Sequence, residues 1–132
     1  MENAISTGPD RDATLRWLVG QGTTPFQRVA TVLANRHKLA IIWELARGTK
    51  RFKELERALS PITAKTLTRN LRDLETMSLI VRESFEAKSP KVEYRLSPIG
   101  QALRPHIVAL CHWAYEFKDV LAPDAPDQEG RT

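Results

Sequence analysis

The stretch that decides the fold reads SPITAKTLTRNLRDLE, from Ser60 to Glu75. If Thr63 caps a helix and each later residue advances by about 100°, the apolar residues fall on one stripe. That stripe consists of Ala64, Leu67, Leu71 and Leu74. The spacing predicts an amphipathic helix from Thr63 to about Met77, with an apolar back that faces a core.

The opposite face of this helix carries Lys65, Arg69, Arg72 and Thr76. A charged helix face is most often only a solvated face, but long cations beside hydroxyls also suit phosphates and base edges in a major groove. The candidate base-reading residues lie near the N-terminal end of the helix: Thr63, Lys65, Thr66, Thr68 and Arg69. Arg72 lies further along the helix and is expected to clamp a phosphate; the alternative is an ion pair with Glu75.

The sequence around this helix predicts an ordered series of short elements. Helices are expected over residues 25–34, 36–47 and 52–59, the first capped by Thr24 with Pro25 as its first residue. Leu39, Ile42, Trp43 and Ala46 recur at helical spacing in the second. A strand over 79–85, a loop over 86–90 and a strand over 91–96 follow, and the last alternates apolar with polar residues.

Further cations flank the predicted reading helix. Arg51, with Lys50 and Lys53, begins the helix that precedes it, and the first helix of a helix-turn-helix crosses the DNA backbone. Lys88 and Lys91 bracket the hairpin tip, where cations can contact the minor groove or phosphates. The alternative for both groups is a solvated surface.

In this order the motifs resemble the winged helix-turn-helix of bacterial HxlR-type transcription regulators, relatives of the MarR group. The matching motifs are RFKEL at 51–55, Lys65-x-Leu67-x5-Asp73-Leu74-Glu75, PKVEYRLS at 90–97 and Gly100-x2-Leu103-x-Pro105. The resemblance runs from Thr24 to about Phe117. It implies a mainly α fold with a small β-hairpin wing (α+β), dimerisation through N- and C-terminal helices, and binding of double-stranded DNA.

The chain also departs from the family pattern. Thr24 stands where family members commonly carry a cysteine, which serves several of them as a redox sensor. Ser78 stands where a helix-ending glycine is usual, and Ala34-Asn35-Arg36-His37 replaces a Gly-Gly-Lys-Trp segment. Cys111 is then expected to be a small apolar packing residue rather than a switch.

A last helix is expected over 98–120, with a kink at Pro105. It carries an apolar stripe that either packs on the body of the protein or forms a dimer interface. We expect dimerisation, because the helix has more apolar surface than so small a body easily covers. The predicted interface residues are Leu103, Ile107, Leu110, Trp113, Ala114 and Phe117.

A length of 132 residues predicts a single domain with a tail at each end. We expect an N-terminal arm over 1–23 that packs either on the body of the protein or on a second subunit, as part of the dimer interface. A winged-helix domain with its dimerisation helix is expected over 24–121 and a disordered tail over 122–132.

Charge and composition narrow the classes of function. Residues 36–72 hold ten Lys and Arg against three Glu, a local balance of +7 that suits a polyanionic partner. No apolar run approaches a membrane span, no export signal is recognisable, and the lone Cys111 excludes an intrachain disulfide, which fits a cytoplasmic protein. The three histidines lack metal-site spacing and no catalytic motif is apparent, so neither metal, cofactor nor enzymatic activity is expected.

Together these features predict a homodimeric, sequence-specific transcriptional regulator, a repressor rather than an activator, that binds a palindromic operator. Two alternatives remain: a sensor of the same fold that responds to a small-molecule effector, and a winged-helix protein-interaction module. The sequence names neither operator, regulated genes nor effector, and leaves the role of the N-terminal arm open.

Overall fold

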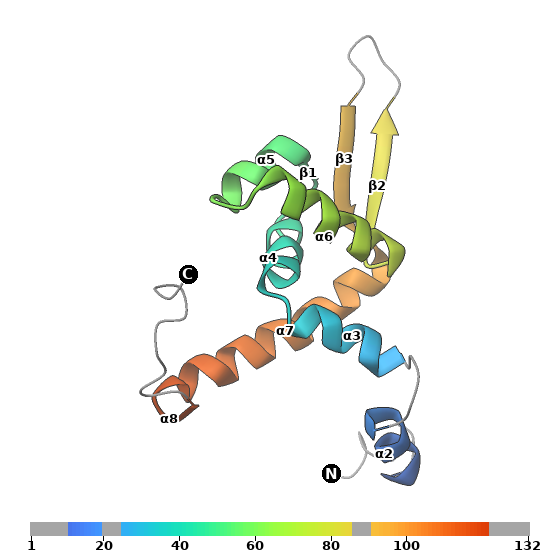
Figure 1. Ribbon diagram of the computed structural model, residues 1–132, viewed down its shortest axis with the longest axis vertical. Helices are drawn as coiled ribbons and strands as arrows, with labels where there is room; N and C mark the ends of the chain where they lie inside the picture. The colour runs from blue at the N-terminus through green and yellow to red at the C-terminus, as the bar shows by residue number, and fades with distance from the viewer. Residues whose placement is uncertain (1–10, 20–24, 86–90, 122–132) are drawn as a thin grey trace.

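A computed structural model describes residues 11–19, 25–85 and 91–121, and its elements follow the predicted order (Figure 1). Helices α2 (Arg11–Val19), α3 (Pro25–Leu33) and α4 (Arg36–Leu45) come first. A short strand β1 (Lys50–Arg51), α5 (Phe52–Ala58) and α6 (Ala64–Thr76) follow. The chain then forms β2 (Ile80–Phe85), β3 (Lys91–Leu96), α7 (Pro98–Glu116) and α8 (Lys118–Leu121). The fold class is confirmed as mainly helical with a small antiparallel sheet.

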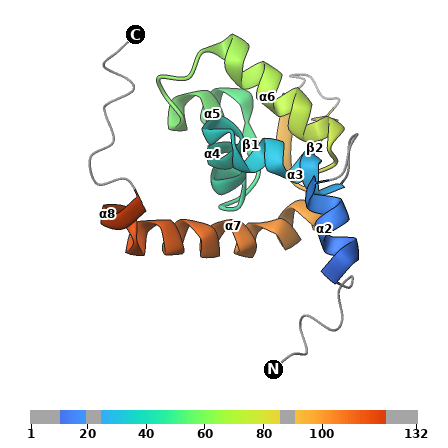
Figure 2. The same cartoon turned by 60° about the horizontal axis from the view of Figure 1, so that its bottom comes forward.

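Helix α4 is the centre of the domain and lies between α6 and α7 (Figures 1 and 2). Its N-cap is Asn35, whose Oδ1 accepts hydrogen bonds from the backbone amides of His37 and Lys38 at 2.9 and 3.0 Å. The helix contacts α3, α5, α6, α7 and β3, so more than one of its faces is covered. Its buried residues are Lys38, Ile41, Ile42 and Leu45. The predicted apolar face was therefore wrong for Trp43, which is 52% exposed, whereas Leu39 and Ala46 pack at the edge of the core.

Helix α6 forms as the opening stretch of sequence predicts. Thr63 is its N-cap, and the Thr63 Oγ1 accepts a hydrogen bond from the Thr66 backbone amide at 3.1 Å. Leu67, Leu71 and Leu74 are each no more than 2% exposed and join the core under the helix. The exception on the stripe is Ala64, which is exposed because the first turn extends past the edge of the core.

The sheet has three strands in the order β1-β3-β2, not the two that the sequence analysis expected. Strand β1 pairs antiparallel with β3, with Lys50 opposite Tyr94 and Arg51 opposite Glu93. Two residues show no alternating pattern, so β1 could not be recognised from sequence. As a result β3 is the central strand, and Lys91, Val92, Glu93 and Tyr94 are all half-buried instead of alternating.

The turn from α6 into the sheet is built around Ser78. This residue has a positive φ of 64°, the left-handed conformation that the usual glycine would adopt freely. The Ser97 hydroxyl donates to the Ser78 carbonyl at 2.6 Å, and it also accepts from the Gly100 amide at 3.0 Å as the N-cap of α7. The departure at Ser78 therefore leaves the sharp turn intact, and Ser97 ties it to the start of α7.

Helix α7 continues through Pro105 and ends at Phe117, so the predicted helix over 98–120 is divided into α7 and α8. Leu103 and Ile107 pack on the core, whereas every residue from 109 to 121 is exposed. Figures 1 and 2 show this second half of α7 extending away from the other helices. The predicted cap at Thr24 and the predicted tail over 122–132 lie outside the described residues.

Candidate nucleic-acid interface

The solvent-facing side of α6 is a shallow hollow rimmed by cations. Its lining residues are Ala64, Lys65, Thr68, Arg69 and Arg72. The three cations are exposed, and within the described part of the chain none of them forms an ion pair or a side-chain hydrogen bond. The structure therefore does not contain the alternative ion pair between Arg72 and Glu75. The leucines behind the helix are buried, so these cations project from a rigid base.

The N-terminal threonines of α6 form a second group. The Thr63 and Thr66 hydroxyls are hydrogen-bonded to each other at 3.0 Å, and the Thr63 oxygen already caps the helix. Both line a separate hollow with His37 and Pro61, beside the first turn of α4. The structure thus separates the predicted set: Thr68 lies among the cations, whereas the Thr63 and Thr66 hydroxyls are engaged within the protein.

Two contacts, with Glu54 and with Glu93, hold Arg51 in place. Its backbone amide donates to the Glu54 carboxylate at 2.8 Å at the start of α5, and its pairing with Glu93 in the sheet fixes it against β3. Arg51 lines one hollow together with Lys53 and Arg57 of α5 and Lys91, the first residue of β3. Lys53 also pairs with Glu56 at 3.8 Å on the exposed surface of α5.

The wing supplies Lys91, while Lys88 lies outside the described residues. The Lys91 ammonium is 3.6 Å from a Glu93 carboxylate oxygen and 5.6 Å from the centre of the Phe85 ring. It remains 40% exposed, and an exposed pair of this kind is worth little.

Two cations that the sequence analysis did not single out lie next to the predicted DNA-binding residues. Arg82 of β2 lines a hollow with Thr68 and Arg72, and Arg57 lies beside Arg51. Arg82 pairs with Tyr94 across the two strands, so the two side chains lie on the same face of the sheet. This pairing is the only signal that could have identified Arg82. That register depends on the loop between the strands and could not be fixed from sequence.

The predicted dimer stripe on α7 is divided by the structure. Leu103 and Ile107 belong to the core of the protomer, and Ile107 is only 4% exposed. Leu110, Trp113 and Phe117 are 43–52% exposed, and the Trp113 and Phe117 rings contact each other with centroids 5.7 Å apart. Cys111 is also exposed in the protomer, so its expected packing role stays a prediction about the dimer. The outer half of the stripe is free to meet another surface.

Two structural features are absent from residues 11–19, 25–85 and 91–121. Those residues contain no group of three or more His, Cys, Asp or Glu able to hold a metal ion. Among them, too, no helix has the length and apolar character needed to cross a membrane.

The arrangement defines a class of protein. A short helix α5, a tight turn, an amphipathic helix α6 with an exposed cationic face, and an adjacent β-hairpin form a winged helix-turn-helix. In this fold the second helix of the pair enters the major groove.

Comparison with known proteins also leads to a helix-turn-helix family. The model of the HxlR-like helix-turn-helix family matches residues 32–121, more than half of the chain, and the protein therefore belongs to that family. It is 35% identical over 88 residues to the HTH-type transcriptional regulator YkvN of Bacillus subtilis, covering 67% of this chain and 75% of that one. A regulator from Halalkalibacterium halodurans, BH0655, is 38% identical and is covered over 80% of its length, with 68% of this chain aligned.

Solved structures agree with this family. A chain from Enterococcus faecalis V583 assigned to MarR-family transcriptional regulators superposes with a TM-score of 0.67 and 36% identity, over 87% of this chain and 94% of that one. The reduced form of the regulator YodB from B. subtilis superposes with a TM-score of 0.65 and 31% identity, over 73% and 95%. The chain is therefore a DNA-binding transcriptional regulator with a winged-helix fold.

Proposed function

We propose that the protein is a homodimeric, cytoplasmic repressor that reads a palindromic operator through α6. The observation that carries this proposal is the free cationic face formed by Lys65, Arg69 and Arg72 on a helix whose back is buried. Cations without an internal partner keep their full charge for phosphates and bases. A repressor is preferred to an activator because occupying a promoter requires no further contact.

The proposed roles follow from position. Lys65 and Arg69 read base edges, where a basic side chain bound to guanine is the commonest specific contact, and Thr68 contacts the bases between them. Thr63 and Thr66 act at the N-terminal end of α6, where their paired hydroxyls shape the helix start and can accept or donate toward the backbone of DNA. Arg72, Arg51, Lys91 and Lys88 bind phosphates, and we add Arg82 and Arg57 to this group.

Dimerisation is proposed through the exposed half of α7. Leu110, Trp113, Ala114 and Phe117 lie together there, and large exposed aromatic residues mark interfaces. Leu103 and Ile107 support this surface from within the protomer. A two-fold dimer presents two α6 helices and would read half-sites whose centres are about 10 bp apart, or a multiple of that spacing.

The direct test of this function is footprinting of purified protein on DNA selected from a random library. The proposal expects a protected site with inverted half-sites, dimers in sedimentation at the same protein concentration, and reporter expression that falls when the site overlaps a promoter. A Trp113→Asp variant is expected to sediment as a monomer and to lose the footprint, whereas Arg104→Asp, at an exposed position in the first half of α7, keeps both. A monomeric wild type with an asymmetric footprint would contradict the proposal.

A second candidate differs only in what controls DNA binding. A hollow of about 850 Å³ lies between α3, the end of α6 and the start of α7, and Val29, Met77, Leu79 and Ile99 contribute apolar lining beside Arg28. Its size and mixed lining suit a small-molecule effector. In that case a Val29→Trp variant would keep the footprint but lose any response of the reporter to an inducing compound.

A further inference from the structure

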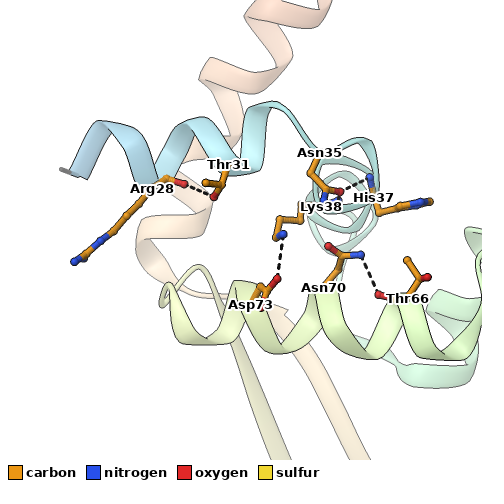
Figure 3. Close-up of polar contacts among 8 residues, drawn as sticks. All are labelled: Arg28, Thr31, Asn35, His37, Lys38, Thr66, Asn70 and Asp73. Carbon is orange, nitrogen blue, oxygen red and sulfur yellow. Dashed lines mark hydrogen bonds and ion pairs between the residues drawn. The ribbon is translucent and has the colours of Figure 1, made fainter. Parts of the chain in front are cut away.

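The interface between α4 and α6 contains a polar seam within an otherwise apolar contact. The seam consists of Lys38 from α4 and of Asn70 and Asp73 from α6 (Figure 3). The Lys38 ammonium is 3.2 Å from the Asp73 Oδ2, and the Asn70 amide donates to the Thr66 carbonyl at 2.9 Å. Figure 3 shows the Lys38 and Asn70 side chains directed into the space between the two helices.

Lys38 is unusual because it is a buried cation. Its side chain is only 9% exposed, and it is the one charged residue classed as buried within the described part of the chain. It therefore does not contribute to the surface that meets DNA, although it lies in the basic segment of the sequence. A buried ammonium is tolerated when a carboxylate is close, so Lys38 depends on Asp73, which is 51% exposed.

The seam residues are sequence neighbours of the cations on the reading face. Asn70 follows Arg69 and Asp73 follows Arg72, and adjacent residues on a helix differ by about 100° in direction. Fixing the direction of Asn70 and Asp73 therefore fixes the direction of Arg69 and Arg72.

The leucines behind α6 do not provide the same restraint. Apolar contacts are non-directional, so the packed leucines hold α6 in place but select its rotation less sharply than a directed bond does. A charged hydrogen bond has a preferred length and direction. Asn35 completes the restraint on the other side, because its side chain caps α4 at the backbone amide of Lys38 itself.

We propose that Lys38 and Asp73 are positioning residues for DNA sequence recognition, and that their ion pair sets the rotation of α6 so that its cations meet base edges. This inference rests on the proposed role of α6 as the reading helix. Lys38, a buried residue of α4, would then contribute to the discrimination between DNA sequences without contacting DNA. Loss of the pair should reduce discrimination between sequences while phosphate binding persists.

The experiment compares the affinity of each variant for the DNA selected by the wild type with its affinity for random DNA, and records the melting temperature in parallel. Lys38→Met and Asp73→Asn are expected to lower the ratio of the two affinities by about tenfold, the loss of roughly one good base contact. Binding to random DNA should change by less than about twofold, because the phosphate-binding cations remain.

Three further variants separate positioning from simple loss of fold. Lys38→Arg keeps the charge and should retain the ratio, and the exchange of charges in a Lys38→Glu, Asp73→Lys double variant should recover part of it. Arg47→Met removes an exposed cation, 70% exposed, from the turn that follows α4, and should leave the ratio unchanged. These variants are compared at a temperature where circular dichroism shows all of them folded.

The outcomes are distinct. If the wild type prefers no sequence over random DNA, the reading role of α6 fails and this inference with it. If the wild type discriminates and Lys38→Met and Asp73→Asn discriminate equally well, only the inference is overturned. Equal losses on selected and random DNA would also overturn it, because they would show a structural role alone.

Discussion

Gly100, the third residue of α7, is predicted to tolerate no side chain. It is buried where the helix crosses the start of the sheet, and a Cβ there would lie 2.2 Å from the Leu79 carbonyl oxygen. Ordinary contacts between carbon and oxygen are about 3.3 Å or longer, so the backbone would have to move by about 1 Å. The same carbonyl accepts a hydrogen bond from the Ser97 amide at 3.0 Å, which a shift would strain.

The expected size of the effect follows from two opposing contributions. Overpacking a core position costs about 1–3 kcal/mol, and the upper end applies because the clash is with backbone that cannot rotate away. Alanine in a helix is favoured over glycine by about 1 kcal/mol. Gly100→Ala should therefore lower the free energy of unfolding by about 2 kcal/mol. For a domain of this size that corresponds to a fall of about 10 °C in melting temperature.

Thermal and urea denaturation of Gly100→Ala are compared with wild type at equal protein concentration, since the proposed dimerisation would make stability depend on concentration. Gln101→Ala provides the matched control, because it changes the adjacent exposed residue and should shift stability by no more than about 0.5 kcal/mol. A Gly100→Ala variant as stable as wild type, or more stable, would refute the packing described for this junction.

Two further predictions concern the turn before the sheet and the clamp on DNA. Because Ser78 has a φ of 64°, Ser78→Gly should stabilise the protein by about 0.5–1 kcal/mol in urea denaturation, and a loss of stability would contradict that backbone conformation. Arg51→Ala should weaken binding to every DNA and reduce the slope of log affinity against log salt by about one counterion; an unchanged slope would mean that Arg51 faces solvent in the complex.

The buried face of α6 and its cationic face could be predicted from the sequence, because helical periodicity places them on opposite sides of the helix. Each of Leu67, Leu71 and Leu74 is buried, and Lys65, Arg69 and Arg72 share one hollow on the other side. The Thr63 cap followed from local chemistry in the same way. Such features depend only on residues within a few turns of one another.

Features that depend on distant residues escaped the sequence analysis. Strand β1 exists because Lys50 and Arg51 meet β3, more than forty positions later in the chain. Lys38 is buried because Asp73 reaches it from α6, and in sequence it is indistinguishable from the exposed cations around it. Ser78 adopts the conformation of a glycine because Ser97 holds its carbonyl from across the junction.

We propose that α6 reads DNA sequence with Lys65 and Arg69. This role is tested by the affinity of Lys65→Ala and Arg69→Ala for the selected site and for random DNA at one salt concentration, beside Arg104→Ala as a control on α7. Each α6 variant is predicted to lose about 1–3 kcal/mol on the selected site and much less on random DNA, and the control to lose nothing. Full affinity of both α6 variants for both DNAs would contradict the assignment of α6 as the reading helix.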